Sequence, residues 1–262
     1  MDRYRIIAIM ILSIFLLGFA GVHASNIAID TKDAIEGIVR VSYVGVSNKI
    51  KIMIEKDSSI YYYDLKNKEG VFPLQLGWGN YTVSVLENVI ENKYKVLTEK
   101  SFKADIREEN IVFLKSAQPI LWNDDMKAIK FAGGLAVETA NDEETVRVIY
   151  DYIVQYISYD YDKSAMLNPD YIPDIEEVFE SRSGICFDYS ALFAGMLRSR
   201  GIPTKLVKGY KEDIANYHSW NETYINGKWE IIDITYDAYL RKNGTGCQIY
   251  KDKKEYEKLR EY

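Results

Sequence analysis

Three residues that lie far apart in the sequence are of the types that catalyse acyl transfer: Cys186, His218 and Asp233. In such a set a thiolate attacks a carbonyl carbon and an imidazole moves the proton. A carboxylate bonded to the imidazole fixes its tautomer and orientation. An isolated cysteine is more often a buried structural residue, and an isolated strand histidine more often belongs to a core. The catalytic interpretation therefore requires a fold that brings these three side chains together.

The segment after Cys186 has the pattern of an apolar helix. Hydrophobic residues recur at helical spacing, and Gly201 and Pro203 end the run. Ser183 or Gly184 can cap the helix at its start. We therefore expect Cys186 in the first turn, where free backbone N–H groups and the helix dipole favour a thiolate.

The region around His218 and Asp233 predicts a β-hairpin. Asn-Gly at 226–227 is a strong signal for a two-residue turn, and it lies between predicted strands 217–225 and 228–236. In the register that this turn imposes, His218 and Asp233 are diagonal neighbours on one face. Their backbones are then about 7–8 Å apart, which an imidazole and a carboxylate can bridge. A slip of one residue would send them to opposite faces.

Zinc binding is the rival use of cysteine and histidine. The chain has two residues of each type and no C-x-x-C spacing, so it is poorly suited to a metal site. We expect no metal and no other cofactor. The formal charge is −6 and no long basic run is present, which argues against a nucleic acid as partner.

Residues 1–24 have the pattern of a signal peptide. Arg3 and Arg5 precede an apolar run, and the segment ends in the small-residue pattern Val22-His23-Ala24. We predict cleavage after Ala24 and a secreted or extracytoplasmic protein at the cell surface. The alternative is an uncleaved segment, which would be the protein's only contact with a membrane. After cleavage, His218 would be the only histidine.

The remaining sequence predicts a β-rich N-terminal domain at 25–107, a linker with a first helix at 108–140, and a catalytic domain at 141–262. The first of these alternates with period two between turn signals, as in a small β-sandwich. Its predicted strands are 38–44, 49–54, 59–65, 81–86, 94–98 and 101–104. Residues 110–121 are expected to be extended, and helices are predicted at 124–136, 141–157 and 175–180.

Around its candidate catalytic residues, the sequence resembles the transglutaminase-like superfamily of papain-like thiol enzymes. The matching segments are 156–160, 184–190, 197–203, 207–210, 218–222 and 229–235. The resemblance covers residues 141–236. It implies an α+β fold for this region, with a cysteine helix packed on an antiparallel sheet. The small all-β sandwich-like domain predicted from the strand pattern precedes it. It also implies that Cys186, His218 and Asp233 form a catalytic triad.

The resemblance implies attack of the thiolate on a carboxamide to give an acyl-thioester. Water then completes hydrolysis or deamidation, whereas an amine completes cross-linking. We expect a cysteine protease or amidase acting on protein or peptide substrates, cell-wall and cell-surface peptides included. A cross-linking transglutaminase or deamidase, and a non-catalytic surface binding module, are the alternatives. Animal members use calcium, but no EF-hand loop occurs in this sequence.

One departure from the papain-like pattern concerns the oxyanion site. Those enzymes carry an amide side chain shortly before the cysteine, and residues 177–182 contain neither Gln nor Asn. The backbone N–H of Cys186 can serve as one donor, and Tyr159 is a candidate for the second. Trp220 and Tyr189 are candidates for substrate binding. The second cysteine, Cys247, is expected to be a free thiol.

Overall fold

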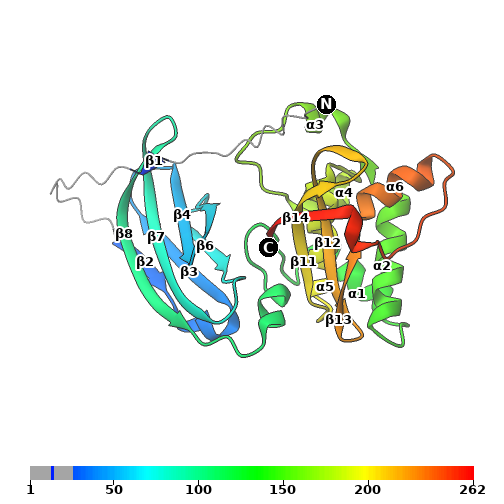
Figure 1. Cartoon of the computed structure of the whole chain (residues 1–262), viewed down its shortest axis with the longest axis horizontal. Coiled ribbons are helices and arrows are strands. Elements are labelled where there is room, and N and C mark those ends of the chain that lie inside the picture. The colour runs from blue at the N-terminus through cyan, green and yellow to red at the C-terminus, as the bar shows by residue number, and fades with distance from the viewer. Residues whose placement is uncertain (1–12, 15–25) are drawn as a thin grey trace.

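The chain forms a β-rich N-terminal part and a mixed α/β C-terminal part that lie side by side (Figure 1). This computed structural model describes residues 13–14 and 26–262. The predicted signal peptide lies outside the described residues, apart from strand β1 (Ser13–Ile14). Within the described ranges, no helix is both long enough and apolar enough to cross a membrane.

The N-terminal part consists of two sheets that share one hydrophobic core. Their strand orders are β1-β8-β7-β4-β5 and β2-β3-β6, and every pairing except β1 with β8 is antiparallel. Inward-facing residues of both sheets, such as Val41 and Val83, meet between them. The strands are β2 (Asn26–Asp30), β3 (Ile38–Val44), β4 (Ile50–Lys56), β5 (Ser59–Asp64), β6 (Glu69–Pro73), β7 (Gly79–Ile90) and β8 (Lys93–Ala104).

The prediction for this region missed strands β2 and β6, and two further segments differ from it. Strand β8 is continuous where two strands were expected. Glu99 and Lys100, which were expected to separate them, are exposed but remain paired with β7. One face of an antiparallel sheet can be solvated, so polar residues need not interrupt a strand. The expected extended linker at 110–121 begins instead as the 3₁₀ helix η2 (Glu109–Leu114), whose Val112 and Phe113 are buried.

The C-terminal part confirms the α+β prediction. Its antiparallel sheet has the order β13-β12-β11-β14, and helix α5 packs against β11 and β12 (Figure 1). The strands are β11 (Thr204–Lys211), β12 (Ile214–Ile225), β13 (Lys228–Ile232) and β14 (Tyr256–Glu261). The helices are α1 (Lys127–Ala136), α2 (Asp142–Tyr156), α3 (Tyr161–Ala165), α4 (Ile175–Ser181), α5 (Cys186–Arg198) and α6 (Ile234–Lys242).

The predicted strand 228–236 is wrong at its C-terminal end. Strand β13 stops at Ile232 because Asp233 caps helix α6, with its Oδ1 accepting the N–H of Tyr236 at 3.0 Å. Strand β14, which pairs with β11, was not predicted. Both differences lie next to the candidate site.

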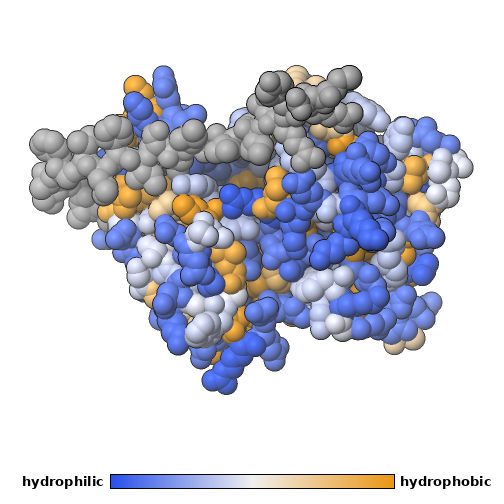
Figure 2. Space-filling view, viewed as in Figure 1, coloured by the Kyte–Doolittle hydropathy of each residue, from blue (hydrophilic) through white to orange (hydrophobic). Residues whose placement is uncertain are grey.

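The two parts are joined at the end of strand β14. The Tyr262 ring packs against both hydrophobic cores, and it meets Tyr61 edge-on with ring centroids 5.7 Å apart. The buried guanidinium of Arg198 donates to the carbonyl oxygens of Thr204, Lys115 and Tyr262 at 2.8–2.9 Å. On the face seen in Figure 2, the surface of the C-terminal part is largely hydrophilic, in keeping with an apolar interior.

Candidate active site

Cys186 is the first residue of helix α5, as predicted, and its thiol is free and partly exposed. Its backbone N–H belongs to the first turn, which has no intrahelical acceptor for such donors. The predicted cap is wrong. Ser183 and Gly184 form the short strand β10, which pairs with β9 (Ser158–Tyr159), and the residue before the helix is Ile185.

Asp188 stabilises the turn that carries the thiol. Its fully buried carboxylate accepts the N–H of Ile185 at 2.9 Å and forms an ion pair with Lys163 at 2.9 Å. It also accepts a hydrogen bond from Tyr171. A Cβ at Gly184 would lie 2.6 Å from the Cβ of Asp188, so only glycine fits there. Two segments that precede it in the chain, at Lys163 and Tyr171, thus hold the turn around Cys186 in place.

His218 and Asp233 are brought together by the predicted hairpin register. Ile225 pairs with Lys228 and Asn221 with Ile232, as the two-residue turn requires. His218 Nε2 lies 2.8 Å from Asp233 Oδ2, and both side chains are buried. The bond to Asp233 uses one ring nitrogen, which leaves Nδ1 to exchange a proton with a thiol.

The surroundings of His218 favour the imidazolium. Burial opposes the charged ring, but the Asp233 carboxylate, its hydrogen bond to the ring and the interaction with Cys186 outweigh burial. Together they raise the pKa of His218 to about 10. Cys186 is one of the groups that raise this pKa, so the thiol lies within electrostatic range of the imidazole.

Tyr256 was not predicted as a residue of this site. Its phenol donates a hydrogen bond to Asp233 Oδ2 at 3.1 Å. Its ring packs against Trp220, with centroids 5.0 Å apart. The available signal was the strand-like segment 256–261, but charged residues dominate it.

The structure locates the remaining predicted site residues. Trp220 is 1% exposed and stacks with His218 at a centroid distance of 6.3 Å. Tyr189 is also 1% exposed, and its hydroxyl donates to the carbonyl of Ile157 at 2.7 Å. Neither ring has surface left for a ligand, so we propose no substrate contact for either. The hydroxyl of Tyr159 lies 3.3 Å from Ser164 Oγ, and burial raises the pKa of this phenol, with a smaller contribution from Cys186.

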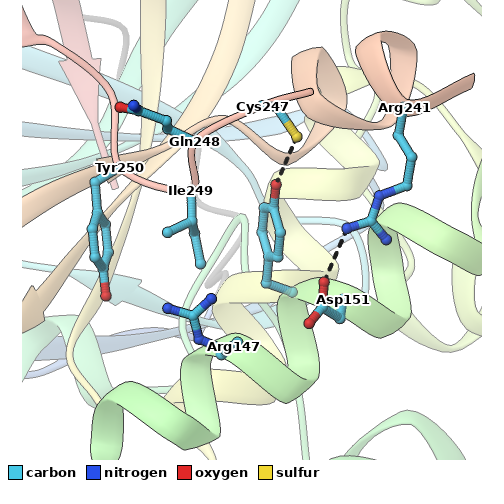
Figure 3. Close-up of a pocket in the computed structure, with 8 residues that line it drawn as sticks. Arg147, Asp151, Arg241, Cys247, Gln248, Ile249 and Tyr250 are labelled. Atoms are coloured by element: carbon cyan, nitrogen blue, oxygen red, sulfur yellow. Dashed lines mark hydrogen bonds and ion pairs between the residues drawn. The ribbon is translucent and has the colours of Figure 1, made fainter. Parts of the chain in front are cut away.

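A separate pocket lies between helices α2 and α6 and the segment 247–250 (Figure 3). It has a volume of about 410 Å³, and Cys186, His218 and Asp233 are not among its lining residues. Cys247 is a free thiol in this pocket, 3.6 Å from the hydroxyl of Tyr150. That hydroxyl donates to Asp237 at 2.8 Å. Cys247 is therefore held away from the candidate catalytic residues.

Known proteins similar to this chain include the kyphoscoliosis peptidase of Mus musculus, which is 26% identical over 116 residues. That match covers 40% of this chain and only 17% of the relative. Among solved structures, a proposed cysteine protease from Cytophaga hutchinsonii has a TM-score of 0.47 at 17% identity, covering 86% of this chain and 76% of that one. The periplasmic domain of TgpA from Pseudomonas aeruginosa has a TM-score of 0.42 at 15% identity, covering 85% and 97%.

The family comparison concerns the segment that holds the candidate site. Residues 129–234 match the model of the transglutaminase-like superfamily. This range includes the cysteine helix α5 and the hairpin that carries His218 and Asp233. It excludes strand β14 and the N-terminal sheets. Residues 129–234 are therefore similar to the transglutaminase-like superfamily, in agreement with the resemblance found in the sequence.

Proposed function

We propose that the protein is a thiol enzyme that cleaves amide bonds in proteins or peptides through an acyl-thioester. The observation that supports this most strongly is the buried 2.8 Å contact between His218 and Asp233, which interacts with a cysteine at a helix start. Burying a histidine–carboxylate pair with no function would reduce the stability of the fold, since both charges lose their hydration. Cys186 is the proposed nucleophile, His218 the proton carrier and Asp233 the residue that orients the imidazole.

In the proposed mechanism, the Cys186 thiolate forms a bond to the carbonyl carbon of the substrate. The carbonyl π-electrons move to oxygen, where the Cys186 backbone N–H stabilises the negative charge. Collapse of this intermediate breaks the C–N bond, and the imidazolium of His218 gives its proton to the departing amine. The neutral imidazole then takes a proton from water, whose oxygen attacks the thioester. The acid product leaves and the thiolate–imidazolium pair is restored.

The proposed setting is outside the cytoplasm. The basic start, the apolar run and the pattern ending at Ala24 support export, with a membrane contact only if the leader is retained. The proposed partners are protein or peptide substrates of the cell wall or cell surface. The acidic composition supports no role in nucleic-acid binding. N-terminal sequencing of the exported protein tests this: a chain that still begins at Met1 in the membrane fraction would contradict cleavage.

Incubation of the protein with a peptide library, followed by mass spectrometry, tests the activity. Backbone cleavage is the expected product, and a Cys186→Ala variant should give none. Conversion of glutamine to glutamate without cleavage would indicate a deamidase, and incorporation of an added amine would indicate a cross-linking acyltransferase. If the wild-type protein leaves the library unchanged but retains peptides on a column, the non-catalytic binding module becomes the better interpretation.

A further inference from the structure

Lys208 lies at the start of helix α5, which carries the candidate nucleophile. It is on strand β11, where it pairs with Ser219 and shares that residue's face of the sheet. Its ammonium nitrogen lies 3.2 Å from the centroid of the Phe187 ring, and Phe187 directly follows Cys186. The residue is only partly buried. A positive charge is thus held at the start of the helix that carries the thiol, and Cys186 interacts with it electrostatically.

The other lysines of strand β11 are neutralised by nearby carboxylates. Lys205 forms an ion pair with Glu261 at 3.1 Å, and Lys211 forms one with Glu255 at 3.3 Å. Lys208 has no ion pair with a carboxylate of residues 26–262; its ammonium faces the rings of Phe187 and Tyr262. Burial lowers the pKa of Lys208 to about 8, and the interaction with Cys186 partly opposes this shift.

A partly buried ammonium is costly unless an anion compensates it. In the resting protein the Cys186 thiolate can be the compensating anion, but its charge disappears when the sulfur is acylated. An anionic group on the bound ligand would then take its place. The net charge of the chain is −6, so most of its surface repels anions. The unpaired ammonium of Lys208 would attract an anion locally.

We propose that Lys208 is a specificity-determining residue that binds a carboxylate of the substrate next to the reacting carbonyl. The proposal rests on the proposed function, because it assumes that Cys186 is the nucleophile. The carboxylate can belong to an aspartate or glutamate side chain, or to the free C-terminus of a peptide. The ring of Phe187 holds the ammonium through a cation–π contact, which keeps it aimed without neutralising it.

Iodoacetate and iodoacetamide form a matched probe pair, since they differ mainly in a carboxylate against an amide. Their rates at Cys186 are measured in the full chain by peptide mapping, and each is divided by its rate with glutathione. Lys208→Met should lower the iodoacetate-to-iodoacetamide ratio roughly tenfold relative to the wild type. Lys208→Arg should keep the ratio, because it keeps the charge. Lys205→Met is the matched control and should leave the ratio unchanged.

An equal iodoacetate-to-iodoacetamide ratio in the wild type and Lys208→Met would overturn the proposal. If both rates also fall by the same factor, Lys208 acts on the thiol rather than on the anion. Dependence of the iodoacetamide rate on His218 is a separate readout of the proposed function, so either idea can fail alone.

Peptide pairs distinguish the two sources of the carboxylate. One pair carries Glu or Gln beside the cleaved bond, and the other ends in a free acid or an amide. In the wild type, kcat/KM should be higher for the acidic peptide than for the neutral peptide of one pair. In Lys208→Met the two values should be equal. Cleavage of all four peptides with no acidic preference would overturn the specificity while leaving the enzyme assignment intact.

Discussion

Tyr256 Oη donates a hydrogen bond to Asp233 Oδ2 at 3.1 Å, the same oxygen that His218 Nε2 meets at 2.8 Å. One carboxylate oxygen therefore receives two partners, one from β12 and one from β14. The other oxygen accepts the N–H of Tyr236 and caps helix α6. The position of Asp233 is thus set from three directions, and each contact can be removed separately.

Tyr256→Phe should lower kcat/KM by roughly fivefold, which corresponds to about 1 kcal/mol in transition-state stabilisation. The ring should still pack on Trp220, so the melting temperature should change little. Without the phenol, Asp233 Oδ2 becomes a stronger acceptor, and the pKa of His218 should rise further, which NMR titration of the ring can measure. Tyr236→Phe is the control, because that hydroxyl donates to Asp213 instead. Equal effects of both changes would contradict a positioning role for Tyr256.

Asp233→Asn and Asp233→Ala should separate catalysis from helix capping. Both variants lose the charge that holds the imidazolium, so turnover should fall by about 10⁴-fold in each. Asparagine keeps an oxygen that can accept the N–H of Tyr236, whereas alanine loses the cap at a further cost of about 1 kcal/mol. Kinetics and urea unfolding of the two variants test this. Undiminished turnover in folded Asp233→Asn would remove Asp233 from the mechanism.

The stability of the protein should decrease with pH because of His218. Its pKa is raised from 6.5 to about 10 in the fold, so the folded state binds a proton that the unfolded state loses. The contribution is complete below about pH 6.5 and is lost as the pH approaches 10. The limiting slope is about 1.4 kcal/mol per pH unit. Unfolding free energies of the wild type and His218→Gln should converge between pH 7 and 10; a constant difference would contradict the raised pKa.

Cys186 should react with iodoacetamide about tenfold faster than Cys247 at pH 6, where an ordinary thiol is mostly protonated. Peptide mapping reads both cysteines in one sample. His218→Ala should slow Cys186 towards the rate of Cys247, and any residual excess would measure the helix start alone. Equally slow alkylation of both thiols in the wild type would favour the binding-module alternative.

Arg198→Met should lower the free energy of unfolding by about 3–5 kcal/mol, because the carbonyl oxygens of Thr204, Lys115 and Tyr262 would each lose a hydrogen bond from a charged donor. Arg200→Met is the matched control: that side chain is exposed, and its replacement should change stability by no more than about 0.5 kcal/mol. Urea denaturation compares the two. A similar small loss in both variants would mean that water replaces the guanidinium.

Much of the candidate site could be predicted because its signals are local. The Asn-Gly turn determines the register of β12 and β13, which brings His218 to Asp233. The apolar run after Cys186 has the period of a helix, and it forms α5. Helix α2 could also be predicted from local signals, since Asn141 caps it by accepting the N–H of Glu144 at 3.0 Å.

The features that were missed depend on tertiary contacts. Residues 231–236 alternate like a strand, but the capping carboxylate of Asp233 turns the chain into α6. Strand β14 is an edge strand rich in charge, and only its pairing with β11 makes it a strand. The position of Lys208 over Phe187 follows from how α5 packs on the sheet, which no local pattern encodes.

Strand β14 also determines the order in which the site can be completed during translation. Cys186, His218 and Asp233 all leave the ribosome before Tyr256, and β11 waits for its outer neighbour until residues 256–261 have emerged. Until then Asp233 lacks its phenol donor, and Arg198 lacks the carbonyl of Tyr262. A nascent chain would therefore contain Cys186 before its surroundings are fully ordered. The thiol would become fully reactive only when strand β14 pairs with β11.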